Sequence, residues 1–299
     1  MRIVTRADWD GLVSAVLLST AEHIEFIQFV HPRDIQDRAI PIPRDSIIAN
    51  LPYHPDCAMW FDHHPAGDDR HGRAPARFKG KFGPAPSAAR LIYEYYGGEA
   101  KFGKYAALVD ATDRVDSAQL TMDDVLNPAD YILLAYTVDP RTHLKDLDRQ
   151  AYFLLLLDWL KTMPVADILE MPEVTGLTER IQAEDQQFRE ALLQHSRVDG
   201  NVIITDFRGV EAPAGNRFIV YTLFPQANVS ASLSDSPDGE SSTIAVGHSI
   251  FNRTCKTNVG KLLAEYGGGG LRGVGTAQFP KEEAEAKFQE IIVRLKESG

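Results

Sequence analysis

The sequence predicts an α/β protein: an N-terminal, mostly parallel sheet flanked by helices, a smaller C-terminal α/β domain, and an active-site cleft between them. In the N-terminal half, short runs rich in β-branched and aromatic residues alternate with helical patterns, the order typical of parallel sheets. Near residue 197 strand-like runs return after a long helical stretch. At 299 residues the chain also exceeds what one core usually organises. We therefore expect domains 1–196 and 197–299.

Four strands are expected in the first domain, and each is a short apolar run. Between the first two lies a helical pattern, GLVSAVLLSTAEH, with apolar residues at helix-compatible spacing. A second helix, SAARLIYEYY, is expected to begin at the N-cap Ser87 and to end before Gly97 and Gly98. The expected strands are residues 2–5 (RIVT), 24–30 (IEFIQFV), 46–50 (SIIAN) and 57–61 (CAMWF).

Residues 103–195 are largely helical in pattern and close with the mixed-charge helix 177–195. In the C-terminal domain we expect strands in 202–207 (VIITDF), 217–224 (RFIVYTLF) and 242–251 (STIAVGHSIF). Helices are expected at 259–266 and 282–295, and a polar, turn-rich loop at 232–242.

Composition excludes several classes of protein. A hydrophobic content of 44% with 24% charged residues is typical of a soluble globular protein. The first residues carry two acids and no long apolar core, and the apolar run 152–160 is too short to span a bilayer, so we expect a cytoplasmic protein. The cysteines Cys57 and Cys255 lack CxxC spacing and predict neither a disulfide framework nor a zinc site. A net charge of -11 disfavours binding to duplex DNA.

Polar side chains follow each of the four expected strands. Arg6, Asp8 and Asp10 come after the first, His31 after the second, Asn50 after the third, and Asp62-His63-His64 after the fourth. Because ligands gather outside the carboxyl ends of parallel strands, we expect these groups at one edge. Carboxylates with imidazole suit Mn²⁺ or Mg²⁺, and paired ions serve in-line attack on phosphorus.

Each group also has a structural interpretation. Asp8 and Asp10 could form a loop in which Asp10 caps the following helix. His63 and His64 could be surface or interface histidines. The convergence of acids and imidazoles on one edge favours the metal site.

The chain resembles the DHH phosphoesterases, and the resemblance spans nearly its whole length. Within that family it is most similar to the bacterial exopolyphosphatase-like proteins near the nanoRNase group, rather than to the larger RecJ-type exonucleases. Five motifs in the family's order carry it: TRADWDGLVSA (5–15), WFDHH (60–64), PSAARLIYEYYG (86–97), LVDATDRVDS (108–117) and EYGGGGLRGVGT (265–276).

The resemblance implies two manganese ions that activate a bridging water against a phosphate presented by the C-terminal domain. It implies metal ligands at Asp8, Asp10 and His63 and in the later aspartate motif, with Asp113 the first choice and Asp110 the second. Asp62 would orient His63, and His64 would contact substrate or protonate the leaving oxygen.

The chain departs from the family's pattern just before the first aspartate and in the second motif. Val4 and Arg6 stand where the family places a histidine or aspartate, and Asn50 stands where an aspartate bridges both metals. An amide is a weaker ligand than a carboxylate, and a guanidinium is none. There are two alternatives. His31 could substitute as a ligand, or Arg6 could occupy the place of one metal and leave a single ion. We favour the second. The expected cofactor is therefore Mn²⁺, with Mg²⁺ as the alternative, as one or two ions.

The C-terminal segments 247–260 and 265–276 are interpreted as a cradle for phosphate and base. Residues 251–272 hold four basic side chains against one acid, and glycines let backbone N–H groups approach an anion. A flexible turn is the alternative, and Leu271 stands where the family has a histidine. The expected substrate-binding residues are Ser249, Asn252, Arg253, Lys256, Gly267, Gly268, Gly269, Gly270 and Arg272.

A second basic cluster lies at 70–81, with Arg70, Arg73, Arg77, Lys79 and Lys81 and no acid. It is either a solvated loop or a clamp over a polyanionic substrate, in which Arg70 and Arg73 would bind.

The sequence thus predicts a metal-dependent phosphoesterase of phosphodiesterase or exopolyphosphatase type. Its expected substrate is small and phosphate-rich: a short single-stranded oligonucleotide, a nucleotide phosphate or polyphosphate. The alternative is a divergent member that binds nucleotide or phosphate with little or no hydrolysis. The oligomeric state stays open, a homodimer included.

Overall fold

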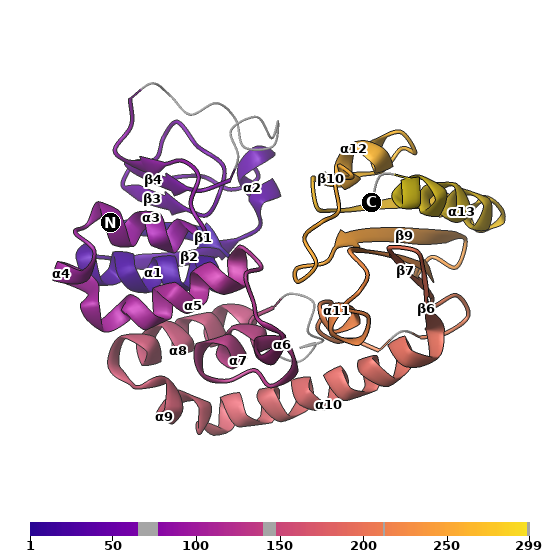
Figure 1. The fold of residues 1–299 in the computed structure, drawn as a ribbon. Helices are drawn as coiled ribbons and strands as arrows, with labels where there is room; N and C mark the ends of the chain where they lie inside the picture. The colour runs from indigo at the N-terminus through magenta and orange to yellow at the C-terminus, as the bar shows by residue number, and fades with distance from the viewer. Residues whose placement is uncertain (65–76, 140–147, 212, 298–299) are drawn as a thin grey trace. The chain divides into compact units, whose positions relative to one another are not determined.

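The computed structural model describes residues 1–64, 77–139, 148–211 and 213–297 (Figure 1). The chain forms two compact units, Met1–Gln119 with Pro128–Glu179, and Leu120–Asn127 with Arg180–Gly299. The long helix α10 (Pro172–His195) contributes residues to both. The domain boundary near residue 197, which falls just after this helix, stays a prediction.

The first unit is built on a five-stranded sheet of order β2-β1-β3-β4-β5. All of its pairings are parallel, as predicted. The fifth strand was not expected, because it lies at the end of the basic segment 70–81. The strands are β1 (Arg2–Arg6), β2 (Phe26–Val30), β3 (Ser46–Ala49), β4 (Met59–Asp62) and β5 (Gly80–Phe82).

Alternate residues of these strands enter two different cores. Ile3, Ile47 and Phe61 face the larger core, formed with the main helices, whereas Ile48 and Trp60 face a smaller one on the other side. This period of two is why the central strands are apolar throughout. The helices packed into the larger core include α1 (Trp9–Ala21), α3 (Ala88–Tyr95), α5 (Ala106–Asp116), α7 (Asp130–Tyr136), α8 (Arg149–Thr162) and α9 (Val165–Leu169).

Three short segments complete the chain's first half. Helices α2 (Pro32–Gln36) and α4 (Glu99–Phe102) belong to the first unit, and α6 (Met122–Leu126) belongs to the second. A 3-10 turn, Gly103–Tyr105, leads directly into α5.

The second unit has a six-stranded sheet of order β10-β11-β9-β8-β7-β6. Only β7 and β8 pair in parallel among these strands. Helix α13 (Lys281–Glu297) packs on it, and α12 (Val259–Ala264) adjoins β10 and β11. The strands are β6 (Ser196–Asp199), β7 (Val202–Asp206), β8 (Val229–Asp235), β9 (Ser241–His248), β10 (Gly269–Leu271) and β11 (Val274–Pro280).

One expectation in this unit is wrong, and another holds only in part. The run 217–224 contains a helix, α11 (Ile219–Leu223), and not a strand. Phe218, Ile219, Val220 and Tyr221 are all buried, and periodicity cannot assign a short apolar run. The expected loop 232–242 is confirmed only for residues 236–240, since 232–235 belong to β8 and 241–242 to β9. β8 buries every second residue and places serines between them.

Among the described residues, no helix is both long and apolar enough to cross a membrane.

Candidate metal centre

The carboxyl ends of β1, β3 and β4 lie together because these strands are neighbours and parallel. Asn50 directly follows β3 with a positive φ of 54°, a conformation that asparagine adopts more readily than most residues. Its N–H donates to the carbonyl of Phe61 on β4 over 2.9 Å. Asn50 is 1% exposed, so its side chain is held inside the edge where the polar groups gather.

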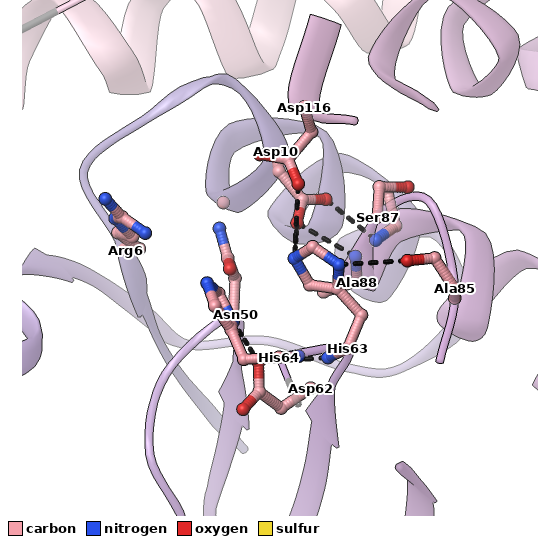
Figure 2. A network of polar contacts seen from close by, with 12 residues as sticks. Arg6, Asp10, Asn50, Asp62, His63, His64, Ala85, Ser87, Ala88 and Asp116 are labelled. Carbon is pink, nitrogen blue, oxygen red and sulfur yellow. Dashed lines mark hydrogen bonds and ion pairs between the residues drawn. The ribbon is translucent and has the colours of Figure 1, made fainter. Parts of the chain in front are cut away.

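Three side chains at this edge form a group that could hold a metal ion: Asp10, His63 and Asp116. Their ligand atoms lie within 4.8 Å of one another. His63 Nε2 is 3.7 Å from Asp10 Oδ2 and 3.2 Å from Asp116 Oδ2. The three side chains point toward one another (Figure 2).

The tautomer of His63 suits a metal ligand. Its Nδ1 lies 3.1 Å from the carbonyl oxygen of Ala85, which can only accept, so Nδ1 carries the proton. Nε2 then presents a lone pair toward Asp10 and Asp116. This atom is buried and makes no hydrogen bond within the described part of the chain. A buried acceptor beside two carboxylates lacks a positively charged partner.

Asp10 lies in the first turn of α1 and is almost fully buried, at 1% exposure. Its two oxygens accept the backbone N–H groups of Ala88 and Ala89, each over 2.8 Å. These groups belong to the N-terminus of α3, where a carboxylate is favoured. Burial raises the pKa of Asp10, with the nearby Asp8 adding to the rise and His63 opposing it.

Asp116 ends α5, and its side chain is 27% exposed. Desolvation, together with the charges of Asp10 and Asp8, raises its pKa well above the usual range. Two carboxyl groups that resist ionisation, next to a bare imidazole nitrogen, fit a divalent cation, which would stabilise both charged forms. The oxygen and nitrogen donors match Mn²⁺ or Mg²⁺.

Asp8 is not part of this group. It is the N-cap of α1 and accepts the N–H of Gly11 over 2.9 Å, so the expected N-cap role belongs to Asp8 and not to Asp10. Asn50 Nδ2 donates to the same oxygen over 3.0 Å. The other oxygen pairs with Arg6 Nε at 2.8 Å. Every oxygen of Asp8 therefore already has a partner from the protein.

Asp62 orients His64 and not His63, contrary to expectation. It is fully buried, and its Oδ1 lies 2.8 Å from His64 Nδ1 and accepts the backbone N–H of His63 over 3.0 Å. A carboxylate on Nδ1 fixes the tautomer and the orientation of the imidazole ring, an arrangement suited to proton transfer through Nε2.

The later aspartate motif contributes a residue that sequence reasoning missed. Arg90 forms ion pairs with both Asp113, at 2.6 Å, and Asp110, at 2.5 Å. Asp113 also accepts a hydrogen bond from the hydroxyl of Ser87. Asp116 lies one turn beyond Asp113 on α5 and reaches His63 instead. The signal was present in DATDRVD, whose acids recur every third residue, and in Arg90, which could have been matched to two of them.

His31 lies elsewhere. It is exposed and caps α2, accepting the N–H of Arg33 on Nδ1 over 3.2 Å. The structure does not bring it to the metal group, so its role as a substitute ligand finds no support.

The expected cradle in the second unit is a compact backbone structure. Gly270 has a φ of 156°, and a side chain there would meet the carbonyl of Val274 on β11; one at Gly260 would meet the carbonyl of Gly270. The glycines let α12, β10 and β11 approach closely, so this segment is not a loose turn. Gly267, Gly268 and Gly269 precede Gly270 in the same turn and strand.

The polar residues of the cradle divide into two kinds. Ser249 is buried and accepts the N–H groups of Phe251 and Asn252, which fixes the turn. Asn252 donates to the carbonyl of Gln226. The basic residues Arg253, Lys256 and Arg272 are exposed, and Arg253 Nε donates to the carbonyl of Ile250 over 2.9 Å.

Of the second basic cluster, Arg70 and Arg73 lie outside the described residues. Arg77 and Lys79 are exposed, and Lys81 pairs with Glu94 at 2.6 Å.

Comparison with solved structures identifies the family. A pGpG-specific phosphodiesterase from Vibrio cholerae, PggH, is 37% identical over 100% of this chain and 99% of its own, with a TM-score of 0.89. The chain belongs to the DHH phosphoesterase family. Its enzyme class is that of metal-dependent phosphoesterases acting on small phosphate-containing substrates.

Two more distant structures share the fold. RecJ from Thermus thermophilus in complex with Mn²⁺ is 15% identical, with a TM-score of 0.56, and its Mg²⁺ complex gives 14% and 0.50. Each match covers 99% of this chain; it covers 51% of the RecJ chain in the Mn²⁺ complex and 49% of the RecJ chain in the Mg²⁺ complex. No protein-family model and no curated protein matches the chain.

Proposed function

We propose that this protein is a phosphodiesterase that hydrolyses short linear oligonucleotides, with a 5'-phosphorylated dinucleotide of the pGpG type as its preferred substrate. The observation that carries the proposal is the Asp10–His63–Asp116 group, with its bare buried imidazole nitrogen, in a chain 37% identical over its full length to a pGpG-specific enzyme. We assign Mn²⁺ to this group, with Mg²⁺ second.

When bound, the divalent cation supplies positive charge to the phosphate and lowers the pKa of the attacking water. The chain's own residues do the rest. Ala85 and the N-terminus of α3 fix His63 and Asp10, so the ligands are held in place by backbone groups. The Asp62–His64 pair is assigned to the leaving oxygen, where His64 donates a proton from Nε2.

The reaction balances as a hydrolysis. Water oxygen forms a bond to phosphorus while the bond from phosphorus to the 3'-oxygen of the first nucleotide breaks. The water brings two protons. One makes up for the proton that His64 delivers to the leaving oxygen, and the other stays with the new phosphate monoester or passes to solvent. A pGpG substrate would yield two molecules of pG.

The basic residues of the second unit are proposed to bind the rest of the substrate. Arg253, Lys256 and Arg272 are exposed cations on the segments that the resemblance assigns to phosphate and base. They lie in a protein of net charge -11, so we expect a short substrate held locally and no stable complex with duplex DNA.

The test is turnover of pGpG, polyphosphate, 3'-phosphoadenosine 5'-phosphate and a DNA duplex, each with Mn²⁺ and with EDTA. We expect metal-dependent cleavage of pGpG above all others. His63→Ala should abolish it, and His23→Ala, which removes an 89%-exposed histidine of the same unit, should not. Binding of pGpG without turnover would instead support the non-hydrolysing alternative.

A further inference from the structure

The environment of Asp8 differs from that of an open metal ligand. Gly11 N–H and Asn50 Nδ2 donate to one oxygen, and Arg6 Nε pairs with the other at 2.8 Å. The side chain of Asp8 is 19% exposed, so solvent has little access to what remains. A carboxylate with two hydrogen-bond donors and an ion pair to a permanent cation has its charge already compensated.

This arrangement is built into the fold and is not a surface contact. Asn50 is 1% exposed and sits at the end of β3 in a left-handed conformation, tied to Phe61 by its N–H. If a metal ion displaced its amide from Asp8, a buried N–H group would lose its acceptor, which is costly. A divalent ion on Asp8 would also lie within a few ångströms of the Arg6 guanidinium, where repulsion is strong.

Arg6 itself is only partly used. Within the described residues its ion-pair partner is Asp8, which takes Nε and leaves the two Nη groups for other acceptors. The side chain is 40% exposed. It stands at the carboxyl end of β1, and Figure 2 shows it on the same edge as His63, with Asn50 between them in this view.

A second unsatisfied atom points to a ligand at this place. Asn50 Oδ1 is buried and makes no hydrogen bond in the described part of the chain. Its Nδ2 is fixed on Asp8, so this oxygen is a buried acceptor without a donor, which a water or a substrate hydroxyl would supply.

We propose that Arg6, held by Asp8 and Asn50, takes the place of a second metal ion: the enzyme uses one divalent cation, and the Arg6 Nη groups bind the non-bridging oxygens of the scissile phosphate. The inference rests on the proposed function and adds the source of the second positive charge. A planar guanidinium with two parallel N–H groups matches the geometry of two phosphate oxygens. Unlike a metal, it supplies charge without binding the attacking water.

Metal stoichiometry is the first test. The purified protein is loaded with Mn²⁺, freed of excess ion and analysed for bound metal per chain. One ion is expected. Two tightly bound ions would overturn the inference and leave the proposed function intact, whereas no ion would overturn both.

Substrate binding without turnover is the second test. pGpG is titrated calorimetrically into the protein in EDTA, where no hydrolysis occurs. Arg6→Met should weaken binding by about tenfold to a hundredfold, as expected for losing a charge-assisted contact, and should still bind one Mn²⁺. Arg2→Met is the matched control, because Arg2 lies at the other end of β1 and also pairs with an aspartate, Asp45. Equal affinity in the two variants would refute the role of Arg6.

The third test reverses the replacement. In Arg6→His/Asn50→Asp, the guanidinium is lost and a second carboxylate faces Asp8, so this variant should bind two Mn²⁺ ions. Asn50→Asp alone keeps Arg6 and should bind one. If the double variant folds, as judged by circular dichroism, and still binds one ion, Arg6 is not what excludes the second metal and the inference fails.

Discussion

Asp116 offers the sharpest test of the metal centre, because the same substitution can be made one helical turn away. Asp116→Asn removes a charge whose oxygen lies 3.2 Å from His63 Nε2 and faces Asp10. Asp113→Asn makes the same change in a residue bound by Arg90 and Ser87. Both residues lie on α5, so helix propensity and solvent contact change similarly.

The expected loss of metal affinity follows from the local electrostatics. A unit charge about 4 Å from another contributes about 4 kcal/mol at an effective dielectric of about 20, and more toward a divalent ion. Water near a side chain that is 27% exposed reduces this, as does the amide oxygen that replaces the carboxylate. We take about 3 kcal/mol, which corresponds to roughly a hundredfold weaker binding of Mn²⁺.

Thermal unfolding measures this change directly. At a Mn²⁺ concentration of about 100 times the wild-type Kd, binding stabilises the wild type by about 2.7 kcal/mol; at the same concentration Asp116→Asn, with a Kd about a hundredfold higher, gains only about 0.4 kcal/mol. Asp113→Asn should retain the full metal response and lose about 1–2 kcal/mol of metal-independent stability, because Arg90 loses a partner. If Asp113→Asn abolishes the metal response while Asp116→Asn retains it, the ligand assignment is wrong.

Two further predictions concern proton positions. Asp62→Asn should lower kcat by about 100-fold or more while Mn²⁺ binding stays unchanged, because Asp62 holds His64 and touches no metal ligand side chain; an unchanged kcat, or loss of the metal, would contradict this. Burial raises the pKa of Asp185 on α10 to about 6, so the stability that its protonated form contributes is full below pH 3.8 and is lost as pH rises through about 6. Asp185→Asn should therefore stabilise the protein at pH 7 by about 1–2 kcal/mol, because the pKa shift of about 2 units must be discounted for partial exposure. The amide oxygen of the new side chain can still accept the N–H of Asn216. Urea unfolding at pH 4 and pH 7 checks it: an equal gain at both pH values would show that ionisation is not the cause.

Much of the fold could be predicted from the sequence because burial imposes simple patterns. The four expected strands of the first unit appear within a few residues of their limits, and Ser87 caps α3 as predicted. The errors fall where local pattern is ambiguous. The run 217–224 is apolar without a period, and the serines of β8 resemble a polar loop from residue 232 onward.

The site could be predicted only as far as the order of strands allows. Parallel strands bring Arg6, Asn50 and His63 to one edge, and the sequence shows which residues follow each strand. The direction of a side chain depends on contacts between distant elements. Asp10 is fixed by α3, and His63 by Ala85, 22 residues beyond it, and neither contact has a local signal.

The proposed choice of metal ligands follows from where the arginines lie. Five aspartates stand near the carboxyl end of the sheet or on α5: Asp8, Asp10, Asp110, Asp113 and Asp116. Arg6 compensates Asp8, and Arg90 compensates Asp110 and Asp113. Asp10 and Asp116 have no ion pair with an arginine or lysine among the described residues, and theirs are the carboxyl groups whose pKa values rise.

This distribution explains why family resemblance and geometry select different residues. An aspartate in the right motif becomes a ligand only if no guanidinium has taken its charge. On the proposed assignment, the two carboxyl groups that remain, with His63 between them, set the cation requirement of the site, and one divalent ion would satisfy it. On the proposed role of Arg6, a second ion would have to displace this arginine from Asp8, so the Arg6–Asp8 ion pair would both limit the number of metals and place a guanidinium beside the phosphate.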